Sequence, residues 1–479
     1  MSTGQQKTLR SAAWLAAGLP LLPLLGVGFL NDDFVGLVQF AARGWRGVLD
    51  SFVPADFEFL RPLGFLLFRA ELSLFGLRPL LFHAVHLALF VLAAWLAGRL
   101  ALRLAGPEAA RWAPALALLY PGRMEAAAWI AAGFDLLALV LSSTALLMAA
   151  APGWDGRHSR GVWLAVLCFV APLAKETAYV LPVAVVAWEA LGVLGSAKPT
   201  TRVVRCAAGF VGALLALGFR LVALGGIGGY AAQPLAAALP QAKRLPEMLA
   251  RVVFLPVNPT YGPASRILSV LCVLAVVVLL TGLVGARRRG AAAPVAAGLV
   301  LALVGLLPPL PYLDPGTMVW NQSRMVALPG LGVVLAAASV LASTVRRRAM
   351  PAGALLLAAW LGATTLNQRA WLGAARSRDA LLGAIEEITR APGPHWVWVA
   401  GPINDYRGAQ LLGGRLAEAV RIKLAGRTIH VDSEFLQHLE QRPVGPAAVD
   451  AVGRRHALRF DPARQEVRAI DWSTPQAVP

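Results

Sequence analysis

The sequence predicts an α-helical polytopic membrane protein with about 11 transmembrane helices and a small C-terminal extracytoplasmic α/β domain. Its composition is 57% hydrophobic and only 15% charged, whereas a soluble protein has about 25% charged residues. Apolar runs recur along the chain and approach the roughly 20 residues needed to cross a bilayer. Basic clusters separate these runs in a regular order, which excludes an ordinary soluble globular protein.

Each apolar run is predicted to form one span. The first run follows the basic Lys7 and Arg10 and has no small-residue cleavage pattern, so we expect a retained span rather than a removed signal peptide. The three cysteines all lie in apolar runs, which argues against a disulfide framework. The predicted spans are 11–30, 80–98, 105–120, 130–150, 161–174, 177–192, 206–224, 266–285, 291–310, 326–344 and 350–366.

The placement of positive charge predicts the orientation. Loops rich in Lys and Arg are usually cytoplasmic, and an odd number of spans then leaves the N-terminus inside and the C-terminus outside. We expect a multi-pass protein of a bacterial-type inner (plasma) membrane. The basic clusters are Lys7/Arg10, Arg99/Arg103/Arg111, Arg157/Arg160, Lys198/Arg202/Arg205, Arg287–Arg289 and Arg346–Arg348.

Two parts of the chain are predicted from this pattern. Residues 1–366 form the transmembrane module, with a long first external loop at 31–79. Amphipathic stretches at 34–49, 62–77 and 245–256 are expected to lie at the membrane interface as helices. Residues 367–479 are more polar and form the external α/β domain. Its predicted elements are a helix at 368–390, strands at 396–400 and 427–432, a helix at 408–424, and a hairpin at 456–471.

An acidic pair follows the first predicted span directly. Asp32 and Asp33 lie at the outer membrane surface, where a carboxylate could remove a proton from an acceptor hydroxyl. Adjacent side chains diverge on a helix or strand, so we expect only one of them to face a given cavity. Nearby cations are expected to keep that carboxylate ionised. The alternative is that the pair only begins and caps the following helix.

The predicted external segments carry more cations than the positive-inside rule leads us to expect. A lipid phosphate would explain them, because Arg and Lys bind phosphate well. The alternative is salt bridging to Glu125, Asp135, Glu176 and Asp314, together with contacts to anionic headgroups. The cations are Arg61, Arg123, Lys175, Arg220, Lys243, Arg244, Arg251, Arg266 and Arg324.

Other motifs narrow the chemistry. His83 and His86 could share a helix face, but no third ligand has a suitable spacing, so we expect hydrogen bonding rather than a metal site. The glycines of 225–229 are followed by no Walker-type lysine. We expect no cofactor, no metal and no nucleic-acid partner. An external site cannot use cytoplasmic nucleotide sugars, so a sugar donor would have to be lipid-linked.

Five motifs in order resemble the C-type glycosyltransferase superfamily, particularly enzymes related to protein O-mannosyltransferases. They span most of residues 31–330. They are Asp32-Asp33; Leu60-Arg61-Pro62-Leu63; Tyr120-Pro121 with Glu125, Trp129-Ile130 and Asp135; Ala174-Lys175-Glu176-Thr177 with Leu181-Pro182; and Arg324 with Leu328-Pro329. The sequence departs from the family pattern at His86, Phe90, Tyr120 and Phe134, positions that we expect to face the substrate.

The resemblance implies a helical bundle whose cavity opens to the outer side and takes a polyprenyl-phosphate sugar from the bilayer. Lys175 and Arg324, with Arg61 or Arg244, would bind the donor phosphate. Asp32, or else Asp33, would act as the base. His83, His86, Glu125, Asp135 and Glu176 are predicted to orient these groups or the substrate.

The implied function is a hexosyl- or pentosyltransferase with a protein, lipid or glycan as its acceptor. The alternative is a transporter or flippase for a lipid-linked or anionic solute, because intramembrane charges also suit that class. Transporters usually contain internal repeats, which this sequence lacks. A third possibility is a non-catalytic relative or an assembly subunit, which the departures from the family pattern would explain.

Overall fold

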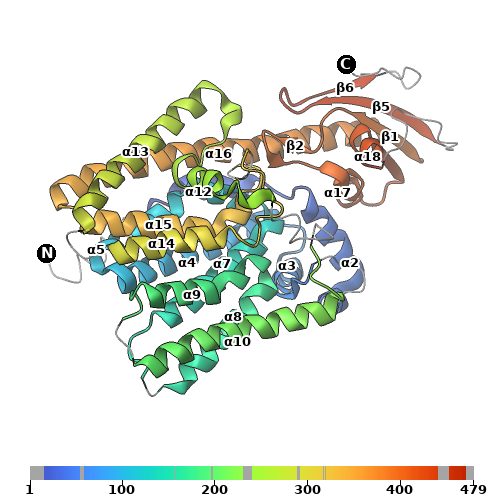
Figure 1. The fold of residues 1–479 in the computed structure, drawn as a ribbon. Coiled ribbons are helices and arrows are strands. Elements are labelled where there is room, and N and C mark those ends of the chain that lie inside the picture. Colours follow the sequence, from blue (N-terminus) through green and yellow to red (C-terminus); the bar gives the residue numbers. More distant parts are fainter. Residues whose placement is uncertain are drawn as a thin grey trace, which may run out of the picture.

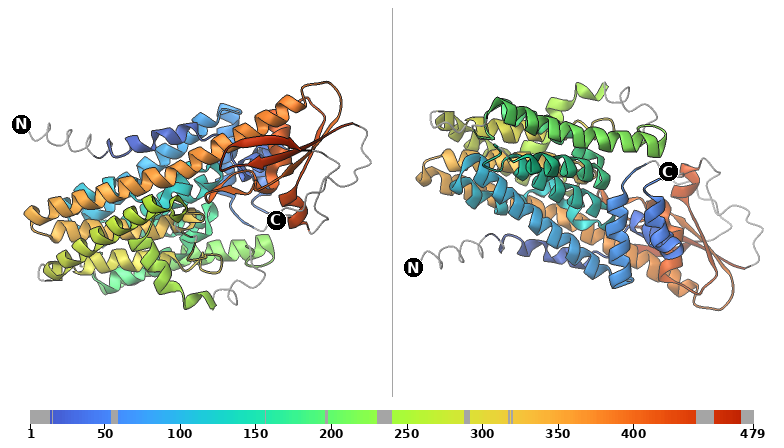
Figure 2. Two further views of the ribbon diagram at one scale, coloured as in Figure 1. Left: turned by 90° about the horizontal axis from the view of Figure 1, so that it is seen from above. Right: turned by 90° about the horizontal axis from the view of Figure 1, so that it is seen from below.

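The computed structural model describes residues 14, 16–53, 59–155, 157–195, 198–229, 240–287, 292–316, 318, 320–440 and 453–470. It shows a mostly helical multi-pass membrane protein with a mixed sheet near the C-terminus. The long helices run roughly side by side, and the sheet lies at one end of the bundle (Figure 2). The chain therefore has an apolar body and one polar end.

Among the described residues, six helices are long and apolar enough to cross a membrane: Pro79–Ala105, Ile130–Ala149, Pro199–Leu224, Pro263–Thr281, Ser323–Ser343 and Arg347–Ile388. His158–Ala174 and Ala292–Gly305 are shorter apolar helices. These eight overlap eight of the predicted spans. The remaining predicted spans contain shorter helices, so the total of about 11 stays a prediction.

The helices follow one another in the order shown in Figure 1. Proline at the first or second position begins many of them, because its fixed φ suits the first turn and its missing N–H costs nothing there. The α-helices are α2 (Asp32–Asp50), α3 (Pro62–Phe75), α4 (Pro79–Ala105), α5 (Pro107–Leu119), α6 (Met124–Ala128), α7 (Gly133–Ala149), α8 (His158–Ala174), α9 (Leu181–Ala190), α10 (Pro199–Leu224), α12 (Leu245–Phe254), α13 (Pro263–Arg287), α14 (Ala292–Gly305), α15 (Ala327–Ser343), α16 (Arg346–Ile388), α17 (Leu416–Lys423) and α18 (Glu434–Leu439).

Short 3₁₀ helices connect the longer elements. Leu19–Gly26, named η1, lies within the first predicted span, of which residues 11–13 and 15 lie outside the described residues. The others are η2 (Pro121–Arg123), η3 (Ile130–Ala132), η4 (Glu176–Val180), η5 (Pro259–Tyr261), η6 (Ser323–Val326) and η7 (Gly413–Arg415).

Helix α15 forms the centre of the bundle, and almost all its side chains are buried. It packs closely on α14 because both helices have glycine at the contact. A Cβ on Gly332 would lie 2.4 Å from the backbone nitrogen of Ala302, and one on Gly298 would lie 2.6 Å from that of Ala336. Small residues of this kind let helix backbones approach each other within membranes.

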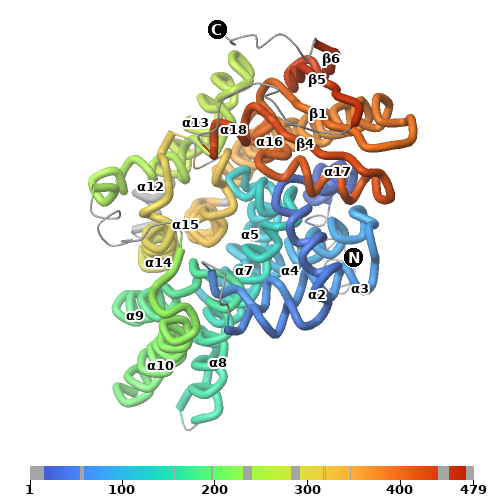
Figure 3. Tube along the Cα trace, turned by 90° about the vertical axis from the view of Figure 1, so that its right-hand side faces the viewer, coloured from blue at the N-terminus to red at the C-terminus, as the bar shows by residue number. Residues whose placement is uncertain are grey.

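The three predicted amphipathic helices are present. They correspond to α2, α3 and α12, whose bounds lie within a few residues of the predicted ones. Helix α2 is broken at Gly44, where φ is 58° and ψ is −142°. Helices α8 and α10 lie side by side at one edge of the molecule, away from the C-terminal sheet (Figure 3).

The C-terminal region has the predicted α/β content. A four-stranded sheet has the order β4-β1-β5-β6, in which β1 is parallel to β4 and β5, and β5 pairs antiparallel with β6. The hairpin predicted at 456–471 is confirmed. The strands are β1 (His395–Ala400), β2 (Asp405–Tyr406), β3 (Ala409–Gln410), β4 (Ile429–Ser433), β5 (Arg454–Asp461) and β6 (Glu466–Ile470).

The last predicted span and the first predicted helix of the tail are one element. Helix α16 has 43 residues and continues across residue 366 from the bundle to the sheet (Figure 1). Val397, Val399 and Leu458 belong to the same continuous core as the helices of the bundle. The change in composition at residue 366 predicted an end of the helix here. The helix continues because its backbone hydrogen bonds form equally well when the side chains are polar and face water.

Candidate active site

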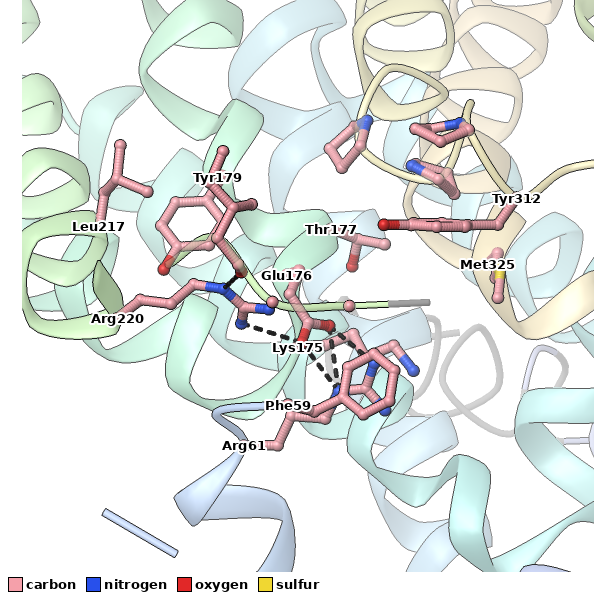
Figure 4. Close-up of a pocket in the computed structure, with 16 residues that line it drawn as sticks. Phe59, Arg61, Lys175, Glu176, Thr177, Tyr179, Leu217, Arg220, Tyr312 and Met325 are labelled. Carbon is pink, nitrogen blue, oxygen red and sulfur yellow. Dashed lines mark hydrogen bonds and ion pairs between the residues drawn. The ribbon is translucent and has the colours of Figure 1, made fainter. Parts of the chain in front are cut away.

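A cavity of about 220 Å³ opens where several helices end. Its wall comes from five places: the segment before α3, the α8–α9 junction, the end of α10 with the glycines after it, the segment after α14, and η6. Most of the wall is apolar, and the charged groups gather at one side (Figure 4). The residues are Phe59, Arg61, Lys175, Glu176, Thr177, Tyr179, Leu217, Arg220, Ile227, Gly228, Gly229, Pro308, Pro309, Pro311, Tyr312 and Met325.

Glu176 is the centre of the charged side. Arg61 donates from Nε to both carboxylate oxygens at 3.0 Å, and its Nη2 lies 3.0 Å from Oε2. Arg220 donates from Nη1 to Oε1 at 3.1 Å. Figure 4 shows both guanidinium groups pointing at Glu176. Burial opposes ionisation of Glu176, but Arg61, Lys175 and Arg220 outweigh it and lower its pKa to about 2.

Lys175 is buried beside this cluster. Its Nζ lies 3.2 Å from Oδ2 of Asp135 on α7. Burial lowers the pKa of Lys175, as does the positive charge of Arg61, while Asp135 acts in the opposite direction. The structure therefore brings four of the predicted site residues close together: Arg61, Lys175, Asp135 and Glu176.

The other two predicted phosphate ligands lie outside the cavity lining. Arg324 pairs with the buried Glu125, and its guanidinium carbon lies 4.8 Å from the ring centre of Trp129. Burial raises the pKa of Glu125, and Arg324 opposes that shift. Arg244 is 3.5 Å from Asp314, and both side chains are largely exposed. All four carboxylates named in the salt-bridge alternative therefore have a basic partner here.

The two residues of the acidic pair have different environments. Asp33 is wholly buried, and its carboxylate accepts hydrogen bonds from the backbone N–H groups of Leu30 at 2.7 Å and Ala131 at 2.6 Å. Burial raises the pKa of Asp33 well above its usual value, against the effect of Arg378 and those two bonds. Asp32 is half-exposed, and its Oδ1 lies 3.4 Å from Nε of Arg415.

The backbone before the acidic pair is tightly held. Arg378 of α16 donates from Nη1 to the carbonyl oxygens of Val27 at 2.9 Å and Phe29 at 2.6 Å. Gly28 has a φ of 74°, and a Cβ there would lie 2.6 Å from Nη1 of Arg378. His83 lies 3.1 Å from the carbonyl oxygen of Gly28 through Nε2. These contacts hold the turn in place before Asp32.

The C-terminal region also contacts this turn. Asn31 has a φ of 39°, which is uncommon for a residue with a side chain. Its backbone N–H donates to the carbonyl of Leu411 at 2.9 Å, and its side-chain amide donates to Oε1 of Gln410 at 2.7 Å. Arg415 lies beside Asp32, so the side chains of Asn31, Gln410 and Arg415 form a polar wall next to the acidic pair.

The four departures from the family pattern fall on buried positions outside the described cavity lining, and their contact with substrate stays a prediction. Tyr120 is buried and donates to the carbonyl of Val252 at 2.8 Å. His86 is buried with Nε2 3.1 Å from Oε1 of Glu71. Phe90 and Phe134 are also buried, and neither lines the cavity. A sequence motif shows which residues are close in the chain, but it does not show which face of a helix lines the cavity.

Two residues with roles at these places were not among the predicted site residues. Arg220 was counted as an external cation, and its position near the end of an apolar span was the available signal. Arg378 lies in a helix rich in basic residues and gave no separate signal. In the described part of the chain, no group of three or more His, Cys, Asp or Glu side chains is placed to hold a metal ion.

Chemically, the cavity combines fixed cations with an apolar wall. Such a site can bind an amphipathic anion, because guanidinium groups pair with phosphate or carboxylate oxygens while the wall accepts hydrocarbon. The only acidic side chain in its described lining is Glu176. The acidic turn at 31–33 lies outside the cavity lining, and Trp129 Nε1 donates to the carbonyl of Leu30 just before it at 3.2 Å.

These features define a class: the chain is a mostly helical, multi-span membrane protein. It has a cationic cavity at its helix ends and a C-terminal α/β region. No protein-family model and no curated protein matches the sequence. The fold is nevertheless similar to that of a solved structure, ArnT from Cupriavidus metallidurans bound to undecaprenyl phosphate. The TM-score is 0.51 at 14% sequence identity, over 90% of this chain and 86% of that chain.

The apo state of ArnT from the same organism gives a TM-score of 0.32 at 15% identity, over 89% of this chain and 86% of that one. The likeness to the undecaprenyl phosphate-bound structure is one of fold, and it covers most of both chains.

Proposed function

We propose that the protein is a glycosyltransferase that moves a hexose or pentose from a polyprenyl-phosphate donor to a hydroxyl acceptor. One observation carries the proposal: Arg61, Lys175 and Arg220 converge on one side of an otherwise apolar cavity. The fold is shared with ArnT bound to undecaprenyl phosphate, which supports a lipid phosphate as the anion. A prenyl chain suits the apolar wall, and its phosphate suits the cations.

The residues divide the reaction between them. The cations at Glu176 hold the donor phosphate and stabilise the charge that develops on it as it leaves. Asp32 takes the proton of the acceptor hydroxyl, since it is the more exposed carboxylate of the acidic pair. Asp33 holds the turn through its two backbone hydrogen bonds. Arg324, paired with Glu125, packs on Trp129, which donates to the backbone just before the acidic pair. No metal is needed for these steps.

The proposed setting is a bacterial-type inner membrane, with the N-terminus cytoplasmic and the C-terminal region outside. The basic clusters between spans support this orientation. The acceptor is a protein, a lipid or a glycan with a free hydroxyl, and the polar wall at Asn31, Gln410 and Arg415 is where it would meet Asp32.

The test uses the purified full chain in lipid nanodiscs with a radiolabelled polyprenyl-phosphate sugar and membrane extract as the source of acceptor. We expect label to move to the acceptor with release of polyprenyl phosphate, and Lys175→Ala to weaken donor binding. Arg244→Ala is the matched control, because its exposed partner Asp314 lies outside the cavity lining. Movement of intact donor between leaflets without transfer would overturn the proposal and favour a transporter.

A further inference from the structure

The cationic side of the cavity is already paired with a carboxylate of the protein itself, that of Glu176. Glu176 receives hydrogen bonds from Arg61 and Arg220, which come from different elements, and Lys175 precedes it in the chain. Carboxylate and phosphate oxygens are bound by guanidinium groups in the same way, often through two parallel bonds. The carboxylate of Glu176 therefore takes the donors that a phosphate would use.

Glu176 is also the most exposed side chain of the cluster. Its side chain is 21% exposed, whereas those of Arg61 and Arg220 are 12% and 4% exposed. The carboxylates of the neighbouring pairs are more deeply buried: Glu125 is fully enclosed, and Asp135 is 2% exposed. Neither of these two lines the cavity.

The cations do not depend on Glu176 alone for their positions. Arg220 donates from Nε to the carbonyl of Ile227 at 2.6 Å, which holds its guanidinium from the side away from Glu176. The guanidinium carbon of Arg61 lies 4.1 Å from the ring centre of Phe59. Both groups can therefore stay in the wall when the carboxylate moves away.

We propose that Glu176 is a built-in competitor of the lipid phosphate, which holds Arg61 and Arg220 in the empty cavity and is displaced when the phosphate binds. This inference rests on the function proposed above. It makes Glu176 a residue that sets the affinity for donor and product, in addition to any role in orienting the arginines.

The competition matters most at product release. In the transfer, the acceptor oxygen bonds to the anomeric carbon, the bond from that carbon to the phosphate oxygen breaks, and the phosphate keeps the electron pair. The acceptor proton goes to the base. The donor phosphodiester has one negative charge, and the released monoester has up to two, with a second pKa of about 6. The product therefore binds the cations more tightly, and Glu176 competes for those cations to release it.

The test is Glu176→Gln, which keeps the size of the side chain and removes its charge. Undecaprenyl phosphate binding is measured on the full chain in nanodiscs, together with product inhibition of transfer. Loss of one like charge next to the bound phosphate should tighten undecaprenyl phosphate binding about tenfold or more. Turnover should fall because product leaves slowly, while the donor KM also falls.

The matched control is Glu189→Gln. It removes the carboxylate of a second buried pair, in which Arg205 Nη1 lies 2.8 Å from Glu189 Oε1, outside the cavity lining. It should leave the affinity unchanged. Glu176→Asp, which keeps the charge but draws it back from the arginines, should give an intermediate affinity and serves if the glutamine variant does not fold.

Two kinds of failure can be told apart. Wild-type protein that binds undecaprenyl phosphate, with Glu176→Gln binding it equally or more weakly, overturns the competitor role and leaves the proposed function intact. That result would mean that Glu176 only orients the arginines. Wild-type protein that binds no undecaprenyl phosphate overturns both the competitor role and the proposed function.

Discussion

The two carboxylates of the acidic pair should separate catalysis from stability. The Asp33 carboxylate accepts two buried backbone hydrogen bonds, at 2.7 and 2.6 Å. Asn has one acceptor oxygen and one donor amide, so Asp33→Asn must leave one of those N–H groups facing another donor. A buried polar group without its partner costs about 1 to 3 kcal/mol. We therefore expect Asp33→Asn to lower the thermal unfolding temperature.

Asp32→Asn should behave in the opposite way. The Asp32 side chain is 49% exposed, and its ion pair with Arg415 is half-exposed too. Exposed pairs contribute about 0 to 1 kcal/mol, so the variant should unfold near the wild-type temperature. Loss of a general base lowers the rate by about 100- to 10,000-fold, and transfer should fall by that much.

The assay measures transfer per folded protein in nanodiscs, undecaprenyl phosphate binding, and thermal unfolding of both variants. Binding should change little in Asp32→Asn, because the residue lies outside the cavity lining. Near-normal transfer by Asp32→Asn would refute its role as the base. Equal lowering of the unfolding temperature by the two variants would refute the prediction that Asp33, but not Asp32, stabilises the fold.

Three further predictions concern the cavity, its charge and the topology. Arg220→Ala should weaken undecaprenyl phosphate binding about tenfold or more, while Arg251→Ala, whose pair with Glu247 lies on α12, should not, as measured by isothermal titration. Because the pKa of Glu176 is lowered to about 2 from its ordinary 4.5, its ionised form contributes stability that is complete above pH 4.5 and is lost as the pH falls toward 2. The unfolding temperatures of wild type and Glu176→Gln should therefore converge on acidification, and a constant difference would contradict this. Cysteines at the exposed Asp50 and Arg464 should react with an impermeant maleimide in intact cells, and one at Ser159 only after permeabilisation; the reverse pattern would invert the topology.

Sequence periodicity and charge placement were sufficient to predict the apolar helices, the three amphipathic helices and the four strands of the larger C-terminal sheet. The helix predicted at 408–424 was wrong in its first half, which contains β3, and only Leu416–Lys423 is α-helical. These features depend on local composition, since a span needs about 20 apolar residues and a strand alternates with a period of two. The boundary at residue 366 was not seen in the structure as a break, because α16 continues through it.

Part of the candidate site was likewise predictable from the sequence, and part was not. The sequence alone singled out ionisable residues in or near the predicted spans, and it named Arg61, Lys175, Asp135 and Glu176. Only the tertiary structure decided that Arg220 joins them, that Arg244 does not, and that Asp33 is buried while Asp32 is not. Such pairings join residues far apart in the chain: Arg324 and Glu125 are 199 positions apart, and Arg415 and Asp32 are 383 apart. They depend on how helices rotate and pack against one another, which the spacing of residues along one helix does not determine.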